Sequence, residues 1–108
     1  MNRHDARQED KIDVSIIGRT DLKRKTYADV IVDLNDIYES KNRDYGDSFG
    51  KSIQEFGPLA FVVRASDKME RIKNLVHSQA IVKDESLTDT VRDLANYCVM
   101  FLMEVDND

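Results

Sequence analysis

Residues 84–97 read DESLTDTVRDLANY and open the most regular amphipathic segment of the chain. Apolar residues recur every three or four positions from Leu87 to Val105, which is the period of one face of an α-helix. Acidic residues at positions 84 and 85 favour the positive N-terminal end of a helix dipole. The segment therefore predicts a helix from about Asp84 to Val105. Its apolar face consists of Leu87, Val91, Leu94, Cys98, Phe101 and Val105.

The opposite face of this helix is polar and carries the first functional signal. It consists of Glu85, Asp89, Arg92 and Asn96. Glu85 and Asp89 stand one turn apart, and two such carboxylates can share a divalent cation. A solvated surface is the alternative interpretation of the same spacing. Cys98 lies on the apolar side, which predicts a buried, inert thiol rather than a nucleophile.

Two further amphipathic segments predict helices over residues 21–42 and 58–77. Thr20 or Asp21 suits the N-cap of the first, and Pro58 suits the first position of the second. Residues 52–56 predict one short helical turn between them. One proline and four glycines in 108 residues leave little that would break helices. We expect an all-α fold, an antiparallel bundle of three main helices over residues 21–108, preceded by a partly disordered arm over residues 1–20.

Three amphipathic helices bury only a modest core in a chain of this length. The last helix also carries Val99, Met100 and Met103 away from its apolar face. We therefore expect a homo-oligomer, most simply a dimer, to complete the bundle.

Composition restricts the partners of the chain. A net charge of −5 argues against bulk binding to a nucleic-acid backbone, although a single nucleotide remains possible as a ligand. One cysteine cannot form an internal disulfide, which favours the reducing cytoplasm. No apolar run approaches the length of a membrane span, so we expect no membrane partner.

Residues 43–50, RDYGDSFG, break the helical period and predict a loop or tight turn. Tyr45 and Phe49 in this loop can stack on a base, and Arg43 can contact a phosphate. Alternatively, both rings close the end of the bundle. Asp67 and Arg71, four apart on the second long helix, are explained by a surface ion pair. Asp67 and Glu70, three apart, can instead contribute metal ligands.

Three separate motifs resemble one known family. They read KNRDYGDSF at 41–49, RASDKMERI at 64–72, and DESLTDT with DLANY at 84–90 and 93–97. Together they resemble the nucleotide modification associated domain, type 1, found largely in bacteriophages and prophages. The resemblance covers about the last two-thirds of the chain. It implies a role in phage nucleotide metabolism or DNA-base modification, with a nucleotide as ligand, in the host-cell cytoplasm.

That family is in turn distantly similar to the all-α, MazG-like nucleoside triphosphate pyrophosphatases. Those enzymes hold Mg²⁺ with a Glu-x-x-Glu helix and a Glu-x-x-Asp helix, and they hydrolyse the α–β phosphate bond. Asp67 and Glu70 match the first pair as Asp-x-x-Glu. The second pair is looser, because Glu85 and Asp89 are four apart and Ser86 stands three before Asp89.

The resemblance implies a role for each matching residue. Asp67, Glu85 and Asp89 would hold Mg²⁺, and Glu70 or Asp93 would assist the attacking water. The phosphates would contact Arg64, Lys68 and Arg71. The base or sugar would contact Tyr45, Phe49, Asn96 and Tyr97.

Three functions fit the sequence. The first is a Mg²⁺-dependent nucleotide pyrophosphohydrolase, and the second is a non-catalytic protein that sequesters a nucleotide. The looser second acidic pair favours the second function. The third is an interaction module whose polar faces are solvated. Metal dependence separates the first from the second, and tight nucleotide binding separates both from the third.

Overall fold

The computed structural model describes residues 24–77 and 83–105, apart from the side chains of residues 83–86. These ranges contain four helices and no strand, which confirms the all-α fold. The helices are α2 (Tyr27–Tyr45), α3 (Ser48–Phe56), α4 (Leu59–Val76) and α5 (Lys83–Val105). The predicted arm over residues 1–20 lies outside the described residues. None of the described helices is long and apolar enough to cross a membrane.

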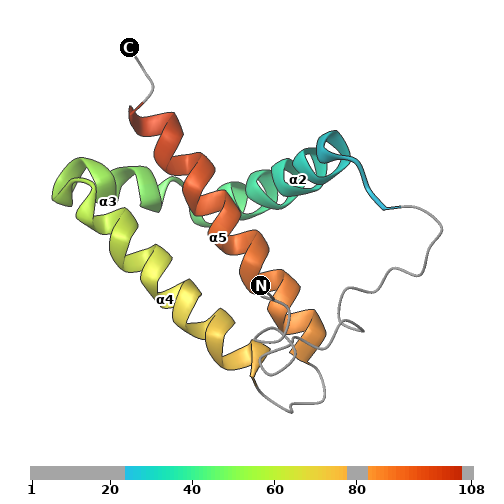
Figure 1. Cartoon of the computed structure of the whole chain (residues 1–108). Helices are drawn as coiled ribbons and strands as arrows, with labels where there is room; N and C mark the ends of the chain where they lie inside the picture. Colours follow the sequence, from blue (N-terminus) through green and yellow to red (C-terminus); the bar gives the residue numbers. More distant parts are fainter. Residues whose placement is uncertain (1–23, 78–82, 106–108) are drawn as a thin grey trace, which may run out of the picture.

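Helices α4 and α5 form an antiparallel hairpin at the centre of the molecule (Figure 1). Phe61 stacks on Phe101 near the end of the hairpin where α4 begins, with ring centroids 4.6 Å apart. Towards the other end, Arg71 Nε donates a hydrogen bond to Thr90 Oγ1 at 3.2 Å. These pairs fix the register in which the two helices face each other.

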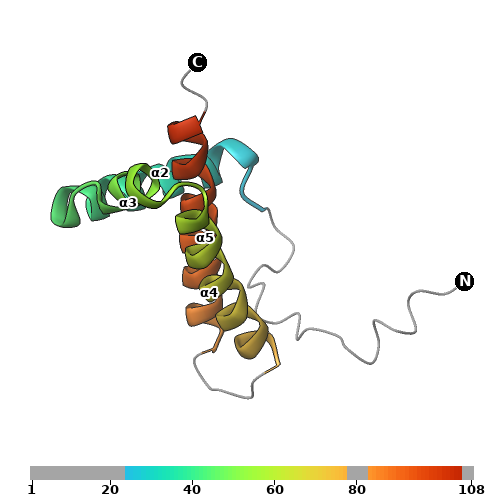
Figure 2. The same cartoon turned by 90° about the vertical axis from the view of Figure 1, so that its left-hand side faces the viewer.

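Helix α2 crosses α5 instead of lying parallel to the hairpin, and α3 links the end of α2 to the start of α4 (Figures 1 and 2). Leu34 is the buried apolar side chain of α2. Asn96 on α5 donates a hydrogen bond from Nδ2 to the Leu34 carbonyl oxygen at 3.2 Å. This contact joins the middle of α2 to the hairpin.

Helix α2 starts later than residue 21 because of a local cap. The Thr26 hydroxyl accepts a hydrogen bond from the Asp29 N–H, and the Asp29 carboxylate accepts one from the Thr26 N–H, both at 3.1 Å. The hydrogen bonds with Thr26 lower the pKa of Asp29, and the one from the Thr26 backbone N–H has the larger effect. Arg24 and Lys25 precede the cap. They would stand near the N-terminus of a helix that began at residue 21, where positive charge is unfavourable. The N-cap of α2 is therefore Thr26, and the predicted caps, Thr20 and Asp21, lie outside the described residues.

The predicted loop over residues 43–50 is much shorter in the structure. Helix α2 runs to Tyr45, and Gly46 ends it with φ of +75°, a conformation that L side chains rarely adopt. Asp47 then caps α3, its carboxylate accepting a hydrogen bond from the Gly50 N–H at 3.1 Å. A Cβ at Gly50 would lie 2.4 Å from the Asp47 carboxylate, so a larger residue there would displace this capping side chain.

The described part of the chain buries few apolar side chains, chiefly Leu34 and Phe49. Val62 and Met69, apolar residues at helical spacing on α4, are 50% and 45% exposed. Cys98 is also exposed, so the prediction of a buried thiol is wrong. Helices α4 and α5 cover only part of each other's apolar side, because Phe101 packs on Phe61 while these three side chains stay exposed. The expected homo-oligomer stays a prediction.

Candidate functional site

A cleft of about 240 Å³ opens where the C-terminal half of α2 and the start of α3 meet the hairpin. Seven of the predicted site residues line it: Tyr45, Phe49, Arg64, Lys68, Asp93, Asn96 and Tyr97. The cleft is thus built from segments that are far apart in the sequence. It lies on the side of the hairpin that α2 crosses.

Two lysines share one carboxylate in this cleft. Lys41 Nζ on α2 and Lys68 Nζ on α4 lie 3.0 Å and 3.1 Å from the two carboxylate oxygens of Asp93 on α5. Partial burial would raise the pKa of Asp93, but the hydrogen bonds and positive charges of Lys41 and Lys68 outweigh it and lower the pKa. Asp93 is therefore ionised at neutral pH, and its single charge faces two cations.

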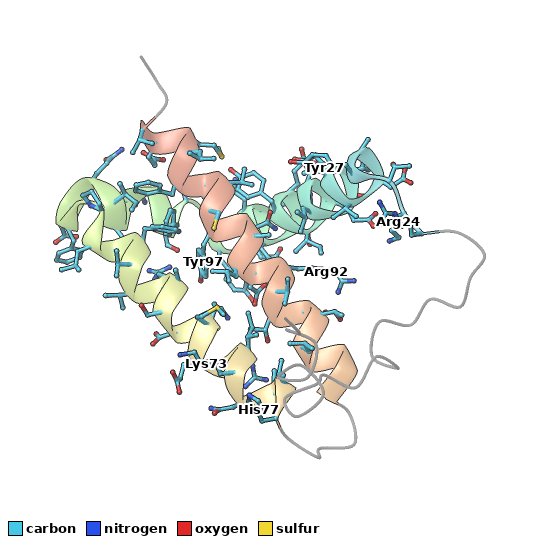
Figure 3. The ribbon with its side chains drawn as sticks, in the orientation of Figure 1. Arg24, Tyr27, Lys73, His77, Arg92 and Tyr97 are labelled. Atoms are coloured by element: carbon cyan, nitrogen blue, oxygen red, sulfur yellow. The ribbon has the colours of Figure 1, made fainter. Side chains whose placement is uncertain are left out.

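A third cation lies on aromatic rings deeper in the cleft wall. The Arg64 guanidinium carbon is 5.8 Å from the ring centroid of Phe49 and 5.7 Å from that of Tyr97. The two rings lie 5.4 Å apart, and Arg64 Nη2 is 3.4 Å from the Ser52 hydroxyl. Figure 3 shows Tyr97 in the space between α4 and α5. These contacts orient Arg64 without neutralising it, since no carboxylate of the described side chains forms an ion pair with it.

The two aromatic residues around Gly46 have different environments. Phe49 is 4% exposed and packs against Tyr97, as expected of a ring that closes the end of the bundle. Tyr45 is 76% exposed at the rim of the cleft, so its ring is accessible to a ligand. Phe49 thus fits the interpretation that these rings close the end of the bundle, and Tyr45 fits the interpretation that they stack on a base.

Asn96 has a structural environment as well. It is buried, and its amide binds the Leu34 carbonyl oxygen on α2. Its side chain forms part of the cleft wall and fastens α2 to α5. Polar spacing on α5 left open whether this face is solvated, and at Asn96 the crossing of α2 covers it.

The remaining predicted residues do not line the cleft. Asp67, Glu70 and Arg43 are exposed. Asp89 is exposed and pairs with Arg92 at 3.0 Å, and Figure 3 shows Arg92 on the side of α5 away from α4.

Two other predictions concern Arg71 and Glu85. Arg71 donates its hydrogen bond to Thr90 rather than pairing with Asp67. Glu85 is in α5, but its side chain is outside the described ones. Among the described residues, no group of three His, Cys, Asp or Glu side chains gathers to hold a metal ion.

Seven residues of the cleft lining were missed from the sequence, Tyr38 and Lys41 among them. Tyr38 and Lys41 line the cleft and stand four and seven positions after Leu34, with Tyr45 four positions beyond Lys41. This spacing puts all four on one face of a continuous helix. The predicted helix already contained Tyr38 and Lys41, but its predicted end at Asn42 left Tyr45 outside the helix, so the shared face was not recognised.

A family model described as nucleotide modification associated domain 1 matches residues 41–105. The matched range begins at Lys41 and contains all of α3, α4 and α5. It therefore includes every cation described above in the cleft. No curated protein and no solved structure gives a significant match.

Proposed function

The chain belongs to the nucleotide modification associated domain 1 family, and we propose that it binds a nucleotide in the cleft between α2, α3 and the hairpin. The observation that carries this proposal is the meeting of Lys41, Lys68 and Arg64 beside an exposed tyrosine ring. The setting we propose is phage or prophage nucleotide metabolism or base modification.

The charges of the cleft favour a phosphate group. Lys41, Arg64 and Lys68 bring three positive charges to a chain whose net charge is −5. Asp47 also lines the cleft, but its carboxylate caps α3, which leaves Asp93 to balance the lysines. A phosphate offers several acceptor oxygens and more than one negative charge, so it competes well with a single carboxylate for the two ammonium groups.

The exposed ring of Tyr45 is the second feature that favours a nucleotide. Its exposed ring at the rim gives an aromatic surface on which a base can stack. The cleft volume of about 240 Å³ is below the ~300–1,000 Å³ of typical enclosed ligand sites. We therefore expect the phosphates to lie inside the cleft and the base to lie over the rim.

Metal-dependent hydrolysis is less well supported than binding. Both oxygens of Asp93 accept hydrogen bonds from lysines, and Asp67, Glu70 and Asp89 do not line the cleft. This donor set does not fit a Mg²⁺ site, because Mg²⁺ requires several oxygen ligands arranged around one point. The predicted role of Mg²⁺ depends on Glu85, and it stays a prediction. The non-catalytic, nucleotide-sequestering function is the one we favour.

Calorimetric titration tests the proposal, using deoxynucleoside mono- and triphosphates and cyclic dinucleotides with and without Mg²⁺. We expect micromolar binding that weakens as salt rises, because ion pairs to phosphate are screened. Lys68→Met keeps most of the side-chain packing and removes the charge, and we expect it to weaken binding at least tenfold. Lys51→Met is the matched control, because Lys51 is exposed on α3 and does not line the cleft.

Chromatography of the recovered ligand separates the two nucleotide functions. An intact ligand with and without Mg²⁺ supports sequestration. Mg²⁺-dependent release of pyrophosphate that is lost in Asp89→Ala would instead establish the hydrolase. Absence of binding to every nucleotide, or equal losses in Lys68→Met and Lys51→Met, would refute a nucleotide site in this cleft.

A further inference from the structure

One side of α5 is apolar, and none of the other described helices covers it. It carries Val91, Ala95, Cys98, Leu102 and Val105, spaced alternately by four and three residues. Leu102 is 51% exposed, and Val91, Cys98 and Val105 are also exposed. Alternating spacing of four and three is the heptad pattern by which one helix packs along another. Helix α4 does not occupy this seam, because it contacts α5 through Asp93, Tyr97 and Phe101.

Helix α4 has a matching apolar side. Leu59, Val62, Ser66, Met69 and Val76 follow the same kind of spacing, with Lys73 at the one remaining position. Leu59, Val62 and Met69 are all exposed. The two helices of the hairpin therefore each present an uncovered seam, and all of these side chains are apolar or small except Lys73.

Both seams lie on the side of the hairpin away from α2. Cys98 stands two positions after Asn96, which binds α2, and two positions correspond to ~200° around a helix. Val62 and Met69 stand two positions before Arg64, which lines the cleft, and Arg71. The seams thus share the face of the hairpin that is towards the viewer in Figure 1, where α2 passes behind α5. We name this surface the hairpin face.

We propose that the hairpin face binds the hairpin face of a second copy of the chain, so that two hairpins form a four-helix core. The face is ~25 Å long at ~1.5 Å per residue and ~20 Å wide for two adjacent helices. This footprint of ~500 Å² on each copy gives ~1,000 Å² for the pair, which is the lower limit of area expected of a specific interface. A patch of ~500 Å² is within the range of the largest apolar patch on a monomer, and such patches often mark an interaction site.

The chemistry of the face favours an identical partner. Its described side chains offer shape and apolar area, but no pattern of charges that would select a different protein. A two-fold axis places equal seams against each other, so an apolar surface of this kind is self-complementary. Four helices in two antiparallel pairs are a standard bundle. Because the cleft lies on the other side of the hairpin, each copy in the dimer keeps its cleft open.

Light scattering and thiol labelling test this interface on the full chain. We expect a mass about twice the chain mass of 12.5 kDa at micromolar concentration. Cys98, the only cysteine, is exposed in the single chain, so dimer formation should slow its reaction with a maleimide at least tenfold as concentration rises. The labelling measurement needs no substitution and does not depend on nucleotide binding.

Two matched variants locate the interface. Leu102→Glu puts a charge on the hairpin face, and we expect a helical monomer whose Cys98 reacts rapidly. Val32→Glu is the control, because Val32 is exposed on α2 two positions from the buried Leu34, and it should remain a dimer. A monomeric wild type at 100 µM, or a dimer that persists in Leu102→Glu with slow labelling, would overturn the proposal. A monomer with slow Cys98 labelling would indicate that residues of the same chain cover the face, which also overturns it.

Discussion

Exchanging Asn96 for aspartate tests whether one side chain fastens α2 to the hairpin. Asn96 is 8% exposed, and its Nδ2 atom donates to the Leu34 carbonyl oxygen at 3.2 Å. Asn96→Asp preserves the shape of the side chain but removes the donor. An ionised carboxylate would then place a negative oxygen against the carbonyl oxygen.

The expected cost has two parts. Loss of the hydrogen bond costs about 1 kcal/mol, and no more, because a carbonyl inside α2 also takes part in helical hydrogen bonding. Burial of the new charge raises the pKa of the introduced carboxyl, and a rise of ~1–2 units corresponds to ~1.4–2.7 kcal/mol. The positive charges of Lys41 and Lys68 reduce the cost of burying the new carboxylate, although both lysines already form ion pairs with Asp93. We expect Asn96→Asp to lower the free energy of unfolding by ~2–4 kcal/mol at pH 7.

The sign of the pH dependence distinguishes this explanation from a simple packing defect. A carboxyl with a raised pKa in the folded state binds its proton more tightly when folded, so the variant loses stability relative to wild type as pH rises. At low pH the protonated carboxyl can donate to Leu34, and the deficit should shrink to about 1 kcal/mol. Urea unfolding followed by circular dichroism between pH 4.5 and 8, at one protein concentration, measures the difference.

Asn96→Ala is the control for that experiment. It removes the hydrogen bond without adding a charge, so its deficit of ~1–2 kcal/mol should not change with pH. A deficit of Asn96→Asp that does not change with pH would show that the new carboxyl is not buried against Leu34. Deficits below ~0.5 kcal/mol in both variants would show that this hydrogen bond does not hold α2 on α5.

Two further predictions concern the cleft. The pKa of Asp93 is lowered in the folded state, so its carboxylate stabilises the fold above the unfolded pKa of ~4 and loses this effect as pH falls through the folded value. Asp93→Asn should make the free energy of unfolding, measured by urea titration, less dependent on pH in the acid range. Because it releases Lys41 and Lys68, it should also tighten triphosphate binding in calorimetry. Unchanged affinity would argue against phosphate contact with these lysines. Phe49→Ala should lower the free energy of unfolding by ~3–5 kcal/mol because Phe49 is almost fully buried. Tyr45→Ala should change stability by less than ~0.5 kcal/mol yet weaken nucleotide binding, and the opposite ranking would exclude the assigned roles of these two rings.

Much of the secondary structure followed from local signals. The apolar period predicted the long helices, and Pro58 correctly marked the start of α4. The boundaries of α2 were missed at both ends. At the start, the Thr26–Asp29 capping box prevailed over earlier candidates, and at the end Tyr45 remained helical up to Gly46. Both are local features, whereas the role of Lys41 in the cleft depends on its contact with Asp93 of α5.

The environment of each predicted site residue depended on contacts that periodicity does not describe. Periodicity assigns a residue to a face of its helix, but it does not say which other element covers that face. Asn96 was on the polar side of α5 as expected, and only the crossing of α2 buried it. Cys98 was on the apolar side as expected, and it is exposed because α4 packs on the part of that side that carries Phe101.

The sequence by itself determined an all-helical chain, its family, and the residue types that a phosphate and a base would require. Only the tertiary structure decided which of those residues meet. Lys41, Lys68 and Asp93 belong to three helices, and their contact depends on the register of α4 against α5 and on the crossing of α2. That geometry arises from packing between segments far apart in the chain, whereas helical periodicity records only neighbours within one segment.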